Sequence, residues 1–265
     1  MTCDEADFDF ATTKTQADGQ VLLTGCVALW DTIAGVWGSF GGPLEGVVSA
    51  TVRNGTTVYI GGKINAQSSS VAFDGIAMYD GRDWVPIAGG GVSGGEVLAL
   101  AVGSENLYVG GSFVMAGSAQ VNRVARWDGV EWHAMGFLDG NVQALSTFGE
   151  VVYAGGDFTT TDGGVRISRI ARYYGGQWQQ VGDGVDGTVF VITPIQECLY
   201  IGGTMTEKMV RTCIGGPYGS GGYILEALNL GSAQVSTVRA FTPATHSVSP
   251  GVGTCVIPNS ECSLQ

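Results

Sequence analysis

Apolar and polar residues alternate in short runs along most of the chain, and glycine, asparagine and aspartate lie between the runs. Alternation with a period of two is typical of β-strands that bury one face, and clusters of turn residues mark their ends. The pattern therefore predicts an all-β fold with many short strands. No apolar run approaches the roughly 20 residues that cross a bilayer, so we expect no membrane span.

Two neighbouring strands recur four times at intervals of roughly 45 to 50 residues, which indicates a repeat architecture. In each copy an apolar strand precedes a strand that has a central tyrosine and ends in two glycines. The apolar strands are predicted at residues 47–52, 97–102, 142–147 and 189–193. The glycine-ended strands are predicted at residues 58–62, 107–111, 152–156 and 199–203.

Two more strands follow in the first three copies, after a loop. The third strand has the form apolar-Ala-x-aromatic, at residues 76–79, 124–127 and 170–173. The fourth strand is marked by a tryptophan, at Trp84, Trp132 and Trp178. Each copy therefore holds four short strands, the content of one propeller blade. Near the N-terminus only the last two strands are found, at residues 27–30 and at Trp37.

Turn residues and glycine pairs support this division. Asn54-Gly55 is predicted to join strands one and two of its copy, and Asp80-Gly81 and Asp128-Gly129 to join strands three and four, because these dipeptides supply the positive φ of tight hairpins. The double glycines are expected where a neighbouring backbone approaches closely or where the strand end bends.

The strand ending in Gly-Gly, the aromatic-Asp turn and the phased tryptophan together resemble the kelch repeat, and also the kelch-related repeats of secreted bacterial proteins and fungal cell-surface landmark proteins. The best matches are Gly-Gly-x-Phe at residues 110–113 and 155–158, and Trp-Asp-Gly at residues 127–129. The first copy departs from the motif at Lys63-Ile64 and the fourth at Thr204-Met205. The resemblance implies a β-propeller of about five four-stranded blades with an incomplete first blade; function does not follow from such a fold.

We therefore expect a single propeller domain over residues 1–265. It divides into a partial blade (1–42), three full blades (43–89, 90–136 and 137–184) and an irregular last blade with a closing segment (185–265). In the last part, residues 222–228 are predicted to be the third strand, and 234–241 and 254–257 further strands.

Three arrangements would complete the first blade. Strands from the C-terminal region would close the ring, the interpretation that we place first. In the second arrangement the chain is part of a longer protein. In the third, a neighbouring copy supplies the missing strands and so builds a homo-oligomer or filament.

The cysteines gather at the two ends of the chain, with none between residues 27 and 197. They form no Cys-x-x-Cys pair and no zinc-type spacing, so we interpret them as disulfides of an oxidising compartment. Six buried thiols in a cytosolic protein is the alternative. The pairing is open; the sequence-local possibilities are Cys3–Cys26, Cys198–Cys213 and Cys255–Cys262.

Composition narrows the partners. The chain has 24 acidic and 12 basic residues and a formal charge of −12, without the basic face of a nucleic-acid binder or the attraction to an anionic membrane surface. The acidic N-terminal residues lack the apolar core of a signal peptide.

Most recurring side chains have a structural explanation. The phased tryptophans are expected to pack between blades and not to stack on sugars. Asp31, Asp80 and Asp128 are expected to stabilise turns and not to bind calcium. The loop at residues 182–187 lacks the dense acidic spacing of a calcium site. The pairs Arg123/Arg126 and Arg169/Arg172 are expected to be structural.

With two histidines, His133 and His246, no catalytic constellation is readable, so we expect no enzyme, no metal and no cofactor. The sequence Asn54-Gly55-Thr56 is a glycosylation sequon at a predicted hairpin tip. The loops between strands two and three differ most among the copies, at residues 63–75, 112–122, 157–168 and 204–222. The last of them, with Pro217 and Tyr218, is the candidate contact surface.

These observations favour an extracellular or cell-surface, non-catalytic propeller that contacts proteins or glycans, and that is a candidate subunit of an extracellular assembly or fibre. One alternative is an intracellular kelch-like adaptor that docks a protein partner. The other is an enzyme with its site in the central channel.

Overall fold

The computed structural model describes most of the central part of the chain and short segments near both ends. The described backbone comprises residues 14–15, 21–22, 28–31, 36–39, 44, 46–68, 71–195, 198–205, 209–213, 224–227, 253–254 and 263–264. Side chains are described for residues 44, 46–64, 74–194 and 198–205. The chain divides into two compact units, Met1–Phe137 and Leu138–Gln265, which are described separately.

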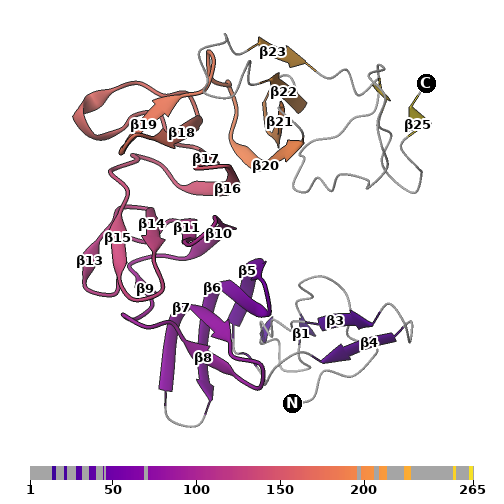
Figure 1. The fold of residues 1–265 in the computed structure, drawn as a ribbon, viewed down its shortest axis with the longest axis vertical. Helices are drawn as coiled ribbons and strands as arrows, with labels where there is room; N and C mark the ends of the chain where they lie inside the picture. The colour runs from indigo at the N-terminus through magenta and orange to yellow at the C-terminus, as the bar shows by residue number, and fades with distance from the viewer. Residues whose placement is uncertain are drawn as a thin grey trace. The chain divides into compact units, whose positions relative to one another are not determined.

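The first unit contains two four-stranded antiparallel sheets, each in chain order (Figure 1). Sheet 1 consists of β5 (Gly46–Asn54), β6 (Thr57–Ser68), β7 (Val71–Tyr79) and β8 (Trp84–Pro86). Sheet 2 consists of β10 (Val97–Val102), β11 (Leu107–Gly111), β14 (Val124–Trp127) and β15 (Trp132–Ala134). Smaller antiparallel pairings join β1 (Lys14–Thr15) to β2 (Val21–Leu22), β3 (Ala28–Asp31) to β4 (Val36–Ser39), and β12 (Met115–Ala116) to both β9 (Val92–Ser93) and β13 (Ala119–Gln120).

The second unit repeats the same four-stranded order twice. Sheet 3 consists of β16 (Val142–Phe148), β17 (Val151–Gly156), β18 (Ile170–Tyr174) and β19 (Gln177–Gln180). Sheet 4 consists of β20 (Val189–Ile195), β21 (Cys198–Gly203), β22 (Met209–Cys213) and β23 (Ile224–Ala227). A short hairpin joins β24 (Gly253–Thr254) to β25 (Ser263–Leu264).

The all-β prediction and the four strands of each copy are confirmed. The one helical segment in the described part is the single 3-10 turn η2 (Asp162–Gly164). None of the described residues belongs to a helix with the length and apolarity that crossing a bilayer requires.

In each of sheets 1 to 4, the first strand carries a register shift opposite the double glycine of the second strand. The shifts lie between Val48 and Ala50, Val97 and Ala99, Val142 and Ala144, and Val189 and Val191. Such a bulge places one extra residue on the first strand and increases its local twist. The repeat therefore includes a bulge as well as four strands.

The two glycines of a pair have different packing roles. A Cβ on the first glycine would meet the first strand of the next sheet: on Gly61 it would lie 2.9 Å from the Cβ of Val97, and on Gly155 2.8 Å from the Cβ of Val189. A Cβ on the second glycine would instead overlap the carbonyl oxygen of a residue on its own sheet's first strand or just before it, at Gly62, Gly111, Gly156 and Gly203. The first glycine thus permits close packing between sheets, and the second permits the bulge. The expected close approach of a neighbouring backbone is present at the second glycine, whereas the first glycine makes room for a valine side chain of the next sheet.

In sheets 2 to 4, the residue after the double glycine forms a hydrogen bond to the backbone just before the first strand of its sheet. Ser112, Asp157 and Thr204 occupy this position, and each side-chain oxygen accepts a hydrogen bond from the backbone N–H that precedes the first strand. The next residue is buried in every copy, as Ile64, Phe113, Phe158 or Met205. The two copies that depart from the kelch-like motif therefore keep its buried position.

The phased tryptophans are core residues where their side chains are described, at Trp84, Trp127, Trp132 and Trp178. In the first unit, Trp127 Nε1 donates to Ala88 O at 3.0 Å and Trp132 Nε1 donates to Gly90 O at 2.8 Å. These bonds tie sheet 2 to the segment that follows sheet 1. Packing between sheets is therefore confirmed for Trp127 and Trp132, and burial for all four tryptophans.

Sheet 4 corrects one predicted strand. Residues 222–228 were expected to form the third strand, but β22 is the third strand and β23 is the fourth. The signal that identifies β22 is Arg211, which pairs with Tyr200 as Arg126 pairs with Tyr108. It is weak in the sequence because Thr212 replaces the aromatic residue of the motif.

Two further expectations concern loops and tail strands. Residues 63–75 were expected to form a loop, but they extend β6 and β7 into a longer hairpin, with Asn65 opposite Asp74 and Ser68 opposite Val71. Residues 234–241 lie outside the described part, and of residues 254–257 only Thr254 is described, in β24.

Candidate functional site

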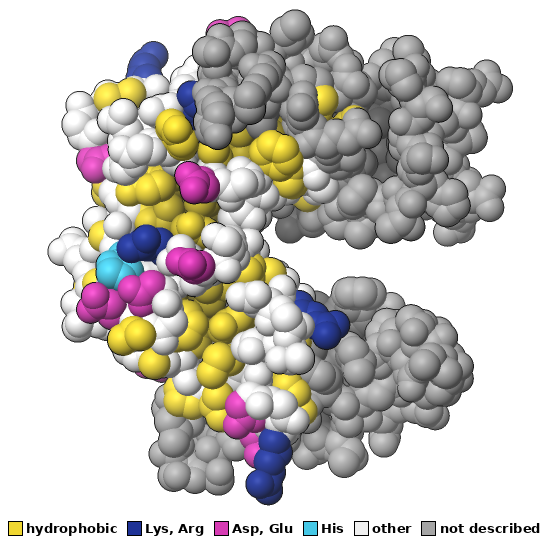
Figure 2. Space-filling model, viewed as in Figure 1, with side chains coloured by type: hydrophobic (Ala, Val, Ile, Leu, Met, Phe, Trp, Pro, Cys, Tyr) yellow, Lys and Arg dark blue, Asp and Glu magenta, His cyan; other side chains and the backbone are white. Residues whose placement is uncertain are grey.

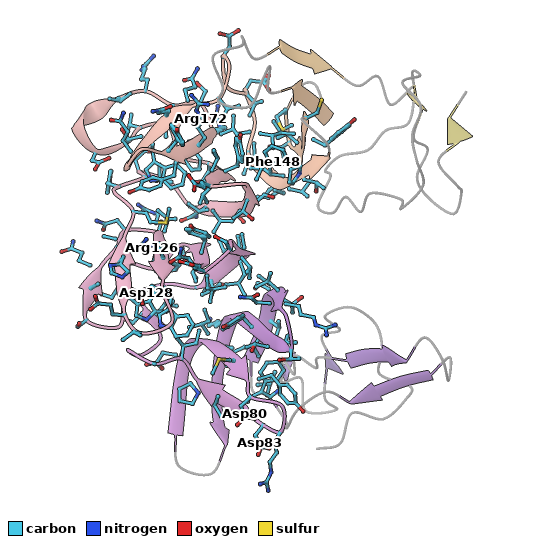
Figure 3. All side chains as sticks on the ribbon, in the orientation of Figure 1. Asp80, Asp83, Arg126, Asp128, Phe148 and Arg172 are labelled. Carbon is cyan, nitrogen blue, oxygen red and sulfur yellow. The ribbon has the colours of Figure 1, made fainter. Side chains whose placement is uncertain are left out.

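The β14–β15 hairpin carries the charged cluster that stands out from the repeat. Trp127 and Trp132 face each other and are buried. Because side chains alternate along a strand, four neighbours share the opposite, solvent-facing side. They form two opposed pairs, Arg126 with His133 and Asp128 with Glu131. We call these four residues the hairpin cluster; Arg126 and Asp128 are labelled in Figure 3.

Asp128 divides its two oxygens between the turn and the cluster. Oδ1 accepts the backbone N–H groups of Val130 and Glu131, each at 2.9 Å. Oδ2 lies 2.6 Å from Nε2 of His133, and Glu131 Oε1 lies 4.0 Å from the same nitrogen. The hydrogen bond from Glu131 N–H, the bond to His133 and the bond from Val130 N–H hold the pKa of Asp128 well below its usual range.

The equivalent turn of sheet 1 shows which hydrogen bonds of Asp128 belong to the turn itself. Asp80 Oδ1 accepts the N–H groups of Arg82 and Asp83, each at 2.9 Å. The bonds from Asp83 and Arg82 lower the pKa of Asp80. The turn interpretation of Asp80 and Asp128 is thus confirmed, whereas the side chain of Asp31 lies outside the described residues. The imidazole has no counterpart in sheet 1, where Val85 occupies the position of His133.

The hairpin of sheet 3 gives a second comparison. Its turn consists of Gly175 and Gly176, and Gln179 occupies the position of His133. Gln179 accepts a hydrogen bond from Arg172 Nε at 3.1 Å. The cross-strand arginine is therefore bonded to its partner in sheet 3, whereas in sheet 2 the partner, His133, is bonded to Asp128. Figure 2 shows the described histidine, in cyan, beside acidic side chains on the molecular surface.

Two other arginines have structural positions. Arg123 and Arg169 have positive φ values of 76° and 62°, at the place where sheet 1 has Gly75 with φ 72°. Arg169 Nη1 donates to Val185 O at 3.2 Å, and the carbonyl of each arginine accepts the N–H of the second glycine, Gly111 or Gly156. Non-glycine residues occupy this region only a few per cent of the time, so these bonds help to hold the backbone there.

The predicted glycosylation sequon lies at a hairpin tip. Asn54 is the last residue of β5 and pairs with Thr57, so the turn consists of Gly55 and Thr56 and lies one residue later than expected. Gly55 has φ 59°, and all three sequon residues are exposed. The acceptor amide is therefore in a position that a glycosylating enzyme can reach.

The predicted cysteine and loop sites are described only in part. Cys198 is disulfide-bonded, and the residue opposite it across β21 and β22 is Cys213. Antiparallel partners have Cα separations that suit a disulfide. The side chain of Cys213, the residues Cys3, Cys26, Cys255 and Cys262, and the contact loop with Pro217 and Tyr218 lie outside the described residues.

A pocket of about 340 Å³ lies in the first unit. It is lined partly by glycines, together with Lys63, Asp74 and Glu96. Lys63 Nζ lies 3.8 Å from Glu96 Oε1, with exposed fractions of 70% and 43%, so this ion pair contributes little. In the next copy the corresponding segment folds back as β12 and β13. Apart from Gly62 of the double glycine, its lining residues belong to no motif, so no sequence signal indicated this pocket.

Comparisons with known proteins identify no family. No family model matches the chain, and no curated protein matches it. Among solved structures, the computationally designed Ika8 protein is 16% identical, with a TM-score of 0.46, over 73% of this chain and 55% of that one. A protein described as the extracellular domain of a hybrid two-component system from B. thetaiotaomicron is 12% identical, with a TM-score of 0.41, over 82% of this chain and 29% of that one. The chain thus spans about half of the first neighbour and less than a third of the second.

Proposed function

We propose that the chain is an extracellular or cell-surface, non-catalytic β-propeller that contacts proteins or glycans through the loops between its second and third strands. The observation that carries the proposal is the division of the repeat into a constant and a variable part. Four sheets share strand order and a bulge on the first strand, while the segment after the double glycine differs among the first three copies. Binding residues concentrate on variable loops held by a rigid scaffold.

The variable segments take three different forms in the first three copies. Residues 63–75 extend the β6–β7 hairpin, and residues 112–122 form β12 and β13. In the third copy the bridge between Thr160 and Arg166 encloses η2. That loop is anchored by Asp139, whose Oδ1 accepts the N–H groups of Thr159 and Thr160. Differences of backbone, and not only of side chains, suit the recognition of partners by shape.

Two features support an extracellular location. Cys198 is disulfide-bonded, and structural disulfides persist mainly in oxidising compartments. We propose that Cys213, the residue opposite it, is its partner. The sequon at Asn54 is exposed on a two-residue turn. Glycosylation and an oxidising environment are two properties of one secretory route.

A binding role also suits the chemistry of the described side chains. His133 is bonded to Asp128 on an exposed turn, and among the described contacts it is not bonded to a serine, threonine or cysteine nucleophile. The pocket beside Lys63 and Glu96 has charged side chains that are largely solvated. A general base or nucleophile usually works in a desolvated site where its pKa is tuned, so non-catalytic contacts are the better explanation.

Secretion from eukaryotic cells tests the location. We expect the secreted protein to lose mass on treatment with an N-glycosidase, and Thr56→Ala, which removes the sequon but keeps Asn54 in its turn, to abolish that shift. Thr57→Ala, one residue outside the sequon, is the matched control and keeps the shift. Thiol titration in denaturant without reductant should find no free cysteine. Six reactive thiols in the native secreted protein would refute the extracellular part.

The arrangement of the copies has its own test. We propose that they form a ring of about five blades, with C-terminal strands completing the first. Electron micrographs of the full chain should then show closed, monodisperse particles. Fibres or concentration-dependent oligomers would instead favour completion by a neighbouring copy.

A further inference from the structure

The geometry of the hairpin cluster points to a surface site for a divalent metal ion such as zinc. We infer that Asp128 Oδ2, Glu131 Oε1 and His133 Nε2 are the protein ligands. This site does not depend on the proposed extracellular function, and it revises the expectation that the chain has no metal site.

The three ligand atoms already lie together. All lie within 4.8 Å of one another. Asp128 and Glu131 are the first and last residues of the turn between β14 and β15, and His133 lies on β15. One imidazole nitrogen and two carboxylate oxygens form a donor set that zinc accepts, with ligand bonds of about 2.0 to 2.2 Å. A tetrahedral ion with these bond lengths holds two ligand atoms roughly 3.3 to 3.6 Å apart, so Oδ2 and Nε2 have to separate from 2.6 Å by rotation of exposed side chains.

The turn does not need the atoms that would bind the metal. Asp128 holds the turn through Oδ1 alone, as Asp80 does in sheet 1. Oδ2 is therefore available to a ligand without loss of turn geometry. A preformed position costs less reorganisation on binding than one that has to be assembled.

Charge provides the second, independent observation. Asp128 lies opposite Glu131, and like charges directly opposite each other are unfavourable. In the sheet 1 turn, Arg82 Nε lies 3.4 Å from Asp83 Oδ2. In sheet 2 the position of Arg82 is occupied by Val130, which is 75% exposed, so the cation that offsets the acid is missing. A bound divalent cation would replace it.

The remaining cation of the cluster does not substitute for Arg82. Among the described residues, Arg126 makes no ion pair within 4.0 Å, although it lies directly opposite His133. Arg172, at the same place in sheet 3, is bonded to Gln179. Among the described hairpins, sheet 2 therefore has an imidazole opposite its cross-strand arginine, where sheet 3 has Gln179. Its turn also has two acids without the arginine that accompanies them in sheet 1.

Three protein ligands leave at least one position of a tetrahedral shell for water or another ligand. Calcium and magnesium prefer shells made of oxygen, so the imidazole favours zinc or a similar borderline metal over either. We expect affinity weaker than that of a closed structural zinc site, because the cluster is exposed and has three ligands.

Titration of the full chain with zinc chloride, followed by calorimetry, tests the site. We expect saturable binding of one ion, and no comparable heat with magnesium chloride. His133→Gln, which installs the residue of sheet 3, should weaken zinc binding at least about tenfold, because even indirect partners of metal ligands change affinity by about 10 to 100-fold. Glu131→Gln should weaken it in the same direction.

Matched controls separate this site from other side chains. Asp83→Asn removes the acid that occupies the position of Glu131 in the turn of sheet 1, and it should leave zinc binding unchanged. His246→Gln, which removes the other histidine, should also leave it unchanged. A zinc-induced shift of the His133 Nε2 resonance in the unmodified protein gives a readout that needs no variant. The inference fails if no binding saturates below about 1 mM, if His133→Gln binds as tightly as the unmodified protein, or if the His133 resonance does not move.

Discussion

Replacement of Gly61 by alanine tests the role assigned to the first glycine of each pair. Gly61 has no positive φ, so alanine would by itself stabilise the fold by about 0.4–1 kcal/mol through the unfolded state. The new methyl group would, however, overlap Cγ1 of Val97 and lie 2.9 Å from its Cβ. Val97 is fully buried, and overpacking of this kind costs about 1–3 kcal/mol. We expect a net loss of about 1–2 kcal/mol in the free energy of unfolding.

The closest clashing atom, Cγ1 of Val97, can be removed by substitution, although the Cβ at 2.9 Å stays. Val97→Ala alone deletes two buried methyl groups and should cost about 2 kcal/mol at about 0.8 kcal/mol per buried group, with a further contribution from the cavity. In the double variant the methyl group introduced at position 61 occupies part of that cavity. We expect a loss smaller than the sum of the two single losses by at least about 1 kcal/mol, within the range measured for residues in contact.

Urea unfolding of the three variants and the unmodified chain provides the comparison. Gly62→Ala is the matched control: its methyl would meet the carbonyl oxygen of Val47, which no side-chain deletion removes, so Val97→Ala should not rescue it. If the losses of Gly61→Ala and Val97→Ala add within about 0.5 kcal/mol, the first glycine is not needed for packing between sheets 1 and 2, and the reasoning is wrong.

Two further predictions concern polar side chains. Ser112→Ala removes the acceptor of the 2.9 Å hydrogen bond from Glu96 N–H and should lower the free energy of unfolding in urea by about 1 kcal/mol. Ser112→Thr should keep that stability, because Thr204 makes the same bond in sheet 4. Equal losses in the two variants would contradict this role. Burial raises the pKa of Asp139, but hydrogen bonds from Thr160 and Thr159 outweigh it and lower the pKa to about 2. Because the pKa is lower in the folded protein, the ionised carboxylate stabilises the fold above the unfolded-state pKa of about 3.9, and this stabilisation is lost as pH falls towards about 2. Asp139→Asn should lose this pH dependence. An unchanged pH profile of the urea midpoint in that variant would refute the prediction.

The sequence predicted what each copy needs in order to pair and turn. The tyrosine of the second strand, the phased tryptophans and the Asp-Gly turns recur at the same places in successive copies, so comparing the copies reveals them even where their contacts are distant in the chain, as with Trp127 and Ala88. The glycine pairs were visible for the same reason, although their division of roles was not. Which glycine contacts the next sheet and which accommodates the bulge depends on Val97 and Val47, and only the structure shows these contacts.

Where one local signal changed, the prediction failed. Thr212 in place of an aromatic residue hid β22, although Arg211 kept the pairing with tyrosine. The hairpin cluster was missed for a different reason. Asp128 was explained fully by its turn, and His133 by its strand, so nothing in the spacing indicated that the free oxygen of one and the ring nitrogen of the other would meet.

The chain order of strands within each sheet bears on how the protein folds during synthesis. Every strand of sheets 1 to 4 pairs with the strand before or after it within its own sheet, so each sheet can form as its four strands leave the ribosome. Local pairing of this kind lowers contact order and speeds folding. A sheet then packs on the preceding sheet of its unit mainly through its own first strand. Examples are β10, which contacts β5 and β6, and β20, which contacts β16 and β17. Gene duplication can therefore add a copy without rethreading those already folded.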